Sequence, residues 1–152
     1  MPIKGSLKAI AKLSQAKFHI YIATNQACVN KKIISLEGLE EIHSHMENLI
    51  KEAGGVVNYI AFCPHTPEEN CSCRKPEIGL LQEIEKKAKH SLKGGFFIGD
   101  KESDFSCARR FGCIPILVET GYGTISLKSD KRPPKDRCFK NLLSAVDYIL
   151  KV

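Results

Sequence analysis

Residues 96–118 read FFIGDKESDFSCARRFGCIPILV, and this stretch determines the fold class that we predict. We divide it into a strand at 96–98, a helix at 103–111 and a strand at 113–118. Gly112 lies where a helix that ends in a left-handed residue needs glycine. A strand, a helix and a second strand in direct succession are typical of parallel β-sheets, in which helices connect neighbouring strands.

The rest of the chain continues the same alternation. Apolar residues at helical or strand spacing predict helices at 7–13, 36–50, 78–88 and 141–150, and strands at 18–23 and 56–62. Ser6 and Ser35 can cap the first two helices, and Gly94-Gly95 is expected to end the third. The polar, basic stretch 120–137 predicts a surface loop. The predicted fold class is therefore α/β: an open, mostly parallel, Rossmann-like sheet with helices on both faces, in a single domain over 1–152.

The composition indicates a globular protein. Its 152 residues are 43% hydrophobic and 26% charged, which excludes disordered and low-complexity classes. No apolar run approaches the roughly 20 residues of a membrane span. Lys4, Lys8 and Lys12 interrupt the apolar positions at the N-terminus, so this segment does not resemble a signal peptide. We expect a cytoplasmic monomer with no membrane partner.

The charge indicates the kind of partner. A net charge of +6 favours an anionic partner such as a phosphorylated small-molecule substrate. No run of Lys and Arg exceeds two residues, and aromatic residues do not alternate with basic ones as they do in a base-stacking surface. We therefore expect no nucleic-acid partner.

Four potential metal ligands crowd into eleven residues of the loop 63–76: Cys63, His65, Cys71 and Cys73. Residues two apart point the same way in an extended segment, so each pair can hold one ion between its two side chains. Four nitrogen and sulfur ligands with no open position are typical of a structural Zn²⁺ site. The alternative is a set of exposed thiols with a surface histidine. We favour zinc, because exposed free thiols are reactive.

Polar residues follow three of the predicted strands. Thr24-Asn25, Cys63 and Asp100 each stand where a strand ends. Ligands of open α/β sheets bind beyond the carboxyl ends of the strands. We therefore predict the ligand site at this edge of the sheet.

Three short stretches carry a family resemblance. They are ATNQ at 23–26, CRKP at 73–76 and IGDKESD at 98–104. Together they resemble the later motifs of the haloacid-dehalogenase-like phosphatases. The loop 63–76 is similar to that of the branch of this family that acts on heptose bisphosphate and histidinol phosphate. The resemblance implies a haloacid-dehalogenase-type sheet and covers nearly the whole chain.

The resemblance also implies roles for individual residues. It assigns phosphoryl stabilisation to Thr24 and Lys75, substrate contacts to Thr24, Asn25, Gln26, Arg74, Lys75 and Lys101, and catalytic Mg²⁺ to Asp100, with Asp104 as a supporting acid. These residue types suit the chemistry. Hydroxyl and amide groups donate to phosphoryl oxygens, a lysine neutralises the charge that grows on them, and Mg²⁺ binds through few carboxylates.

One motif of the family has no counterpart here. The resemblance implies an N-terminal Asp-x-Asp after a first, central strand, with the first Asp as nucleophile and the second as acid and base. No Asp stands before Asp100, and the chain holds no Asp-x-Asp. We therefore expect this domain to lack its first central strand, to be N-terminally incomplete, and to be inactive alone.

The function implied by the resemblance is a Mg²⁺-dependent phosphomonoester hydrolase that acts on a phosphorylated sugar through an aspartyl-phosphate. The substrate we expect first is D-glycero-D-manno-heptose 1,7-bisphosphate, a precursor of lipopolysaccharide heptose. One alternative is histidinol phosphate. The other is a catalytically dead, zinc-stabilised remnant that serves as a binding module. The presence of Thr24, Lys75 and Asp100 argues against a long-dead site.

Overall fold

The structure, a computed structural model, describes residues 2–152. Its helices are α1 (Ser6–Gln15), α2 (Leu36–Glu52), α3 (Gly79–Ala88), α4 (Glu102–Phe111), α5 (Gly123–Ser126) and α6 (Leu142–Ile149), with two short 3-10 helices, η1 (Pro67–Glu69) and η2 (Lys135–Arg137). Its strands are β1 (Tyr21–Asn25), β2 (Tyr59–Cys63), β3 (Phe96–Gly99), β4 (Ile114–Val118) and β5 (Cys138–Phe139). None of the helices within 2–152 is long and apolar enough to cross a bilayer.

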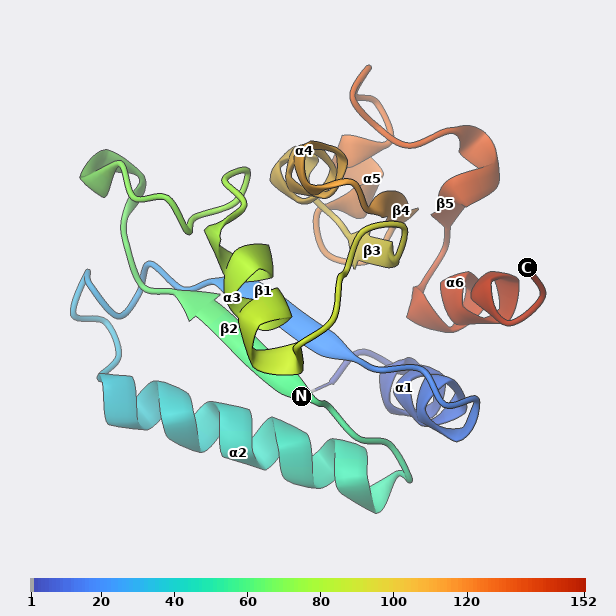
Figure 1. The fold of residues 1–152 in the computed structure, drawn as a ribbon, viewed down its shortest axis with the longest axis horizontal. Helices are drawn as coiled ribbons and strands as arrows, with labels where there is room; N and C mark the ends of the chain where they lie inside the picture. The colour runs from blue at the N-terminus through green and yellow to red at the C-terminus, as the bar shows by residue number, and fades with distance from the viewer. Residues whose placement is uncertain (1) are drawn as a thin grey trace.

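The strands form two parallel sheets rather than one. β1 pairs with β2, and β3, β4 and β5 pair in that order. Within residues 2–152, β1 and β3 share no backbone ladder. Figure 1 shows the arrows of β1 and β2 apart from the short strands β3, β4 and β5, with α1 and α6 side by side on one side of the molecule. The predicted α/β class with parallel strands is therefore confirmed.

Two hydrophobic clusters join the sheets. The first holds Ala9, Leu13, Ile116, Val118, Ala145, Val146 and Ile149, with Ile20, Phe96 and Ile98 packed against it. The second holds Ala61, Cys63, Leu80, Leu81, Ile84, Cys107 and Phe111, with Tyr21, Ala23 and Phe97 packed against it. Residues 20–23 and 96–98 therefore contribute alternating side chains to both clusters. Because α1 and α6 belong to the first cluster and α3 and α4 to the second, helices cover both faces, as predicted.

The helix caps at two predicted positions form as expected. The Ser35 hydroxyl accepts a hydrogen bond from the Gly38 N–H at 2.9 Å. Gly112 ends α4 with φ 95°, a left-handed conformation that glycine adopts without strain. Ser6 is not a cap: it is the first residue of α1, and Gly5 stands before it with φ 85°.

Both early strands begin later than the apolar runs indicate. After α1 the Phe18 N–H bonds back to the Leu13 carbonyl at 3.0 Å, so this residue completes the end of the helix instead of opening β1. The Val56 N–H bonds to the Ser14 hydroxyl at 2.9 Å, which keeps it out of β2. In each case a bond to α1 replaces a strand pairing.

The region 120–137 is more ordered than the predicted surface loop. It contains α5 and η2 and leads into β5, whose residues pair with Leu117 and Val118 of β4. The apolar pattern of the third helix ends at Ala88, and so does α3, but the predicted stop at Gly94-Gly95 is wrong. Lys89 ends the helix with a left-handed φ of 60°, five positions before Gly94.

Candidate functional site

The carboxyl ends of β1 and β2 meet at one edge. Asn25 and Cys63 are register partners, and the Gln26 N–H donates to the Cys63 carbonyl at 2.6 Å. The Asn25 side chain then binds the backbone of Lys75 on both sides. Its Oδ1 accepts from the Lys75 N–H at 3.0 Å, and its Nδ2 donates to the Lys75 carbonyl at 3.3 Å. Asn25 therefore fixes the backbone of a lysine that lies 50 positions away.

The Lys75 ammonium connects the two sheets. Nζ donates to the Ala23 carbonyl of β1 at 2.9 Å and to Asp104 Oδ1 on α4 at 2.6 Å. The Lys75 and Asp104 side chains are only 12% and 7% exposed. A charge-assisted hydrogen bond of this kind is stronger where water is excluded. The cation is therefore held at the point where the ends of β1 and β3 approach.

Asp104 also shapes the turn after β3. Its Oδ2 accepts from the backbone N–H groups of Asp100 and Lys101, each at 3.2 Å. Gly99 leaves room for this carboxylate, because a Cβ at that position would overlap Asp104. Asp104, predicted as a supporting acid, thus binds Lys75 and the backbone of Asp100 and Lys101 at once.

Asp100 is held by the segment 121–126. Its Oδ2 accepts from the Tyr122 N–H at 2.8 Å, and the Ser126 hydroxyl donates to its carbonyl at 2.6 Å. Gly121 has φ 64°, and a Cβ there would overlap Asp100 Oδ2. Tyr122 and Ser126 were not among the predicted site residues. The signal that could have found the turn is the pair of glycines in TGYG at 120–123.

The remaining predicted substrate residues lie around this centre. The Thr24 hydroxyl accepts from Gln26 Nε2 at 3.1 Å, so these two side chains form one polar group at the end of β1. Arg74 Nη1 reaches the His65 carbonyl at 3.4 Å and therefore lies over residues 63–73, the metal-ligand loop. Lys101 is exposed, and its Nζ lies 4.3 Å from the centre of the Tyr122 ring.

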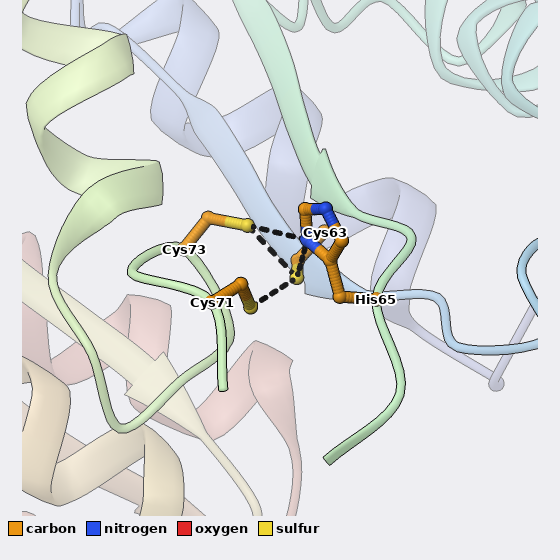
Figure 2. A group of neighbouring side chains, drawn as sticks. All are labelled: Cys63, His65, Cys71 and Cys73. Atoms are coloured by element: carbon orange, nitrogen blue, oxygen red, sulfur yellow. Dashed lines mark hydrogen bonds between the residues drawn. The ribbon is translucent and has the colours of Figure 1, made fainter. Parts of the chain in front are cut away.

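The four predicted metal ligands converge. Ligand atoms of Cys63, His65, Cys71 and Cys73 all lie within 4.8 Å of one another, and Figure 2 shows the side chains pointing toward a common centre. The pairs within hydrogen-bond distance run from 2.9 Å for the sulfurs of Cys63 and Cys73 to 3.5 Å for those of Cys63 and Cys71, and no separation exceeds 4.8 Å. Ligand atoms around a tetrahedral Zn²⁺ are about 3.5–3.8 Å apart. The set therefore fits a small tetrahedral cation once the sulfurs of Cys63 and Cys73 move apart by about 1 Å.

The thiols of this cluster affect one another's ionisation. Burial raises the pKa of Cys63, and burial with hydrogen bonds to neighbouring thiols raises that of Cys73. Burial also opposes ionisation of Cys71, but hydrogen bonds from the N–H groups of Arg74 and Cys73 outweigh it and lower the Cys71 pKa to about 7. Without a cation at most one of the three thiols is ionised near neutral pH. A bound cation would stabilise all three thiolates.

The metal-ligand loop is tied to the rest of the site. A Cβ on Gly79 would lie 2.5 Å from the Ser72 carbonyl, so the start of α3 packs directly on the loop backbone. On the other side, Asn30 Nδ2 donates to both carboxylate oxygens of Glu69, at 3.1 and 3.0 Å. Folding of this loop therefore positions both Lys75, which follows it, and the segment after β1.

Comparison with known proteins assigns the chain to a family. The HAD-hydrolase-like family model matches residues 72–145. A D-glycero-β-D-manno-heptose-1,7-bisphosphate 7-phosphatase of Neisseria meningitidis is 35% identical over 99% of this chain and 82% of the relative. The Pseudomonas putida protein of the same name is 41% identical over 84% of this chain and 73% of the relative.

Solved structures agree with the sequence comparison. The crystal structure of a D,D-heptose 1,7-bisphosphate phosphatase from Bordetella bronchiseptica, complexed with magnesium and phosphate, matches with a TM-score of 0.93 and 34% identity, over 99% of this chain and 84% of that one. A phosphatase of the same name from Burkholderia thailandensis matches at 22% identity with a TM-score of 0.78, which bears on the fold alone. The chain belongs to the HAD-like hydrolases, in the family of the D-glycero-β-D-manno-heptose-1,7-bisphosphate 7-phosphatases.

Proposed function

We propose that this domain removes the 7-phosphate of D-glycero-β-D-manno-heptose 1,7-bisphosphate with Mg²⁺. The names of the relatives support this substrate. The observation that carries the proposal is the contact network at the strand ends: the ammonium of Lys75 is bound to Asp104, and Asp104 in turn holds the backbone of Asp100. One cation and one carboxylate are thereby presented at the edge where α/β sheets bind ligands.

Asp100 is the proposed Mg²⁺ ligand. Its Oδ2 is occupied by the Tyr122 N–H, whereas its Oδ1 has no hydrogen-bond partner among residues 2–152. That oxygen suits Mg²⁺, which binds proteins through one or two carboxylates and completes its shell with water and phosphate oxygens. The Bordetella relative was solved with magnesium and phosphate, which supports the same pair of ligands here. When bound, Mg²⁺ would neutralise charge on the phosphoryl oxygens.

The residues around Asp100 have complementary roles in the proposal. Lys75 stabilises the charge that develops on the transferring phosphoryl group, because its position is fixed by the Ala23 carbonyl and Asp104. Thr24 donates its hydroxyl to a phosphoryl oxygen. Asn25 acts on substrate through Lys75, since both ends of its amide bind the Lys75 backbone.

The nucleophile is the remaining requirement. We propose that it is the first aspartate of an Asp-x-Asp motif, carried by a strand that pairs with both β1 and β3. The arrangement of the sheets supports this, because β1 and β3 share both hydrophobic clusters without pairing with each other. A parallel strand in that position would end beside Lys75 and Asp100 and would satisfy the open backbone edges.

The Cys63, His65, Cys71 and Cys73 cluster is proposed to bind Zn²⁺ in a structural role. Four protein ligands leave no open coordination position, so a metal there does not activate water. The soft sulfur ligands favour Zn²⁺ over Mg²⁺. The metal would order a loop that has few apolar residues of its own and that leads directly to Arg74 and Lys75.

The activity is tested by phosphate release. The chain is compared with a version joined to a strand that ends in Asp-x-Asp-Gly-Thr, and each is given Mg²⁺ with the heptose bisphosphate or with histidinol phosphate. We expect release from the heptose bisphosphate by the extended version only. The matched control replaces the first aspartate with asparagine and should abolish release while leaving the fold unchanged.

The alternatives predict other results in the same assay. If the extended version released phosphate faster from histidinol phosphate than from the heptose bisphosphate, histidinol phosphate would become the proposed substrate. Release from neither substrate, by an extended version that folds and binds Mg²⁺, would contradict the enzymatic proposal and favour a non-catalytic binding module. Loss of release after Lys75→Met would support the role of Lys75 only in an extended version that circular dichroism shows to be folded.

A further inference from the structure

The exposed ring of Tyr122 lies against the exposed ammonium of Lys101. The distance from Lys101 Nζ to the ring centre is 4.3 Å, well within the range of a cation–π contact. Tyr122 is 57% exposed, so an aromatic ring is presented to solvent rather than packed into the core.

The ring attracts the ammonium without neutralising it. No carboxylate lies within ion-pair distance of Lys101 Nζ in residues 2–152, where the ion pairs are Lys12–Asp147, Lys75–Asp104, Arg110–Glu77 and Lys140–Glu119. No acidic side chain of residues 2–152 therefore competes with an anionic ligand for this ammonium. An aromatic face limits the conformations of the long side chain, so less entropy is lost when an anionic group binds it.

The pair sits at the rim of the proposed active site. The Tyr122 N–H binds Asp100 Oδ2, and the Lys101 N–H binds Asp104 Oδ2. The backbones of both residues thus contact the acidic residues of the site, while their side chains extend outward to solvent. The site then has two lysines in different states: Lys75 is buried and paired with Asp104, whereas Lys101 is exposed and has no acidic partner.

We propose that Tyr122 is a specificity-determining residue that positions Lys101 for the second phosphate of a sugar bisphosphate, the phosphate that is not removed. The inference rests on the proposed function. A buried, paired lysine suits the phosphoryl group that reacts, whereas an exposed, unpaired lysine suits a dianion that only has to be recognised. Tyr122 acts through Lys101 and does not itself bind the phosphate.

The experiment measures binding, which needs no turnover. The dissociation constants of heptose 1,7-bisphosphate and heptose 7-phosphate are measured by calorimetry with Mg²⁺ for the unaltered chain and its variants. These two ligands differ only in the 1-phosphate. Tyr122→Leu removes the ring but keeps the backbone N–H that binds Asp100. We expect it to weaken binding of the bisphosphate about two- to fivefold, with binding of the monophosphate unchanged.

Three further variants make the result specific. Tyr122→Phe keeps the ring and should restore the affinity for the bisphosphate. In a Lys101→Met background, Tyr122→Leu should have no further effect, because the group that it positions is gone. Phe18→Leu removes another exposed ring, 43% exposed, and should change neither affinity.

The outcomes separate this inference from the proposed function. Equal weakening of both ligands by Tyr122→Leu would mean that the residue acts on Asp100 or on the fold, and would overturn the inference. So would unchanged affinity for the bisphosphate. If the unaltered chain binds the two ligands equally well, the positioning role falls while the phosphatase proposal stands. If it binds neither, the inference falls, whereas the phosphatase proposal is decided separately by phosphate release from the extended version.

Discussion

Lys75 and Asp104 are 29 positions apart in the sequence, and their side chains form a buried ion pair with 2.6 Å between Nζ and Oδ1. Lys75 follows the metal-ligand loop, and Asp104 lies in the first turn of α4. The pair therefore connects the sheet that contains β1 to the one that contains β3. Asp104 also binds the backbone of Asp100, so one carboxylate aligns the cation and the proposed Mg²⁺ ligand.

Breaking this pair should destabilise the protein strongly. Lys75→Met leaves the Asp104 carboxylate buried without its cation, and the free energy of unfolding should fall by about 3–5 kcal/mol. Urea unfolding measures the change. Lys140→Met is the matched control, because the Lys140 side chain is 83% exposed and its pair with Glu119 should contribute less than about 1 kcal/mol. A similar small loss for both variants would contradict the structural role of the buried pair.

Removal of the metal should unfold the metal-ligand loop. Purified, reduced chain is expected to contain one Zn²⁺ per molecule, and a strong chelator should lower the melting temperature, because metal binding and folding of such loops are coupled. Cys71→Ser should reproduce the effect, whereas Cys28→Ser, which lies outside the cluster, should not. Elemental analysis and thermal unfolding measure both. Full stability without any bound metal would exclude the zinc proposal.

Metal affinity should increase with pH. Burial raises the pKa of the Cys63 thiol, and hydrogen bonds lower that of Cys71 to about 7 against the effect of burial. Zn²⁺ binds thiolates, so protons compete with the metal and are released when it binds. Affinity should therefore rise as the pH rises through about 7, with a steeper dependence than one thiol alone would produce. Competition with a chromophoric chelator over that pH range measures it.

Alkaline conditions should weaken the fold through Cys107. This side chain is fully buried on α4, and burial raises its pKa from the ordinary 9.0 to about 11. Because the folded pKa exceeds the unfolded one, the stabilisation is complete below pH 9 and is lost as the pH rises toward 11. The loss should be about 2 kcal/mol. The free energy of unfolding, measured with denaturant, should fall less between pH 9 and about 11 for Cys107→Ala than for Cys28→Ala. The same pH dependence of stability in both variants would mean that Cys107 does not cause the alkaline loss.

Gly121 should be required for the geometry of Asp100. Gly121→Ala introduces a Cβ that overlaps Asp100 Oδ2 at a residue with φ 64°, so it should both destabilise the fold and weaken Mg²⁺ binding. Gly94→Ala is the control, because Gly94 has φ 82° and no atom within 4 Å of a Cβ. The control should lose about 1 kcal/mol of stability from backbone strain alone and keep its Mg²⁺ affinity. Calorimetric titration of Mg²⁺ compares them.

The elements whose signals are local were predicted well. Ser35, for example, caps its helix through a bond to the residue three positions on, and Gly112 ends α4 in the left-handed conformation expected of it. The metal ligands are close in sequence as well, and residues 63–73 bring them together. By contrast, β1 and β2 begin later than their apolar runs because of bonds to α1, a partner that a local pattern does not contain.

Local patterns specify the α/β class, the side chains of the metal cluster and the polar residues at the strand ends, because periodicity, helix caps and ligand spacing are all encoded within a few residues. Tertiary packing is what pairs Lys75 with Asp104 and places Tyr122 against Asp100 and Lys101. It also lets β1 and β3 share two hydrophobic clusters without pairing. These contacts join residues far apart in the chain. Their formation depends on how the helices pack the two sheets together, and no short stretch of sequence carries that information.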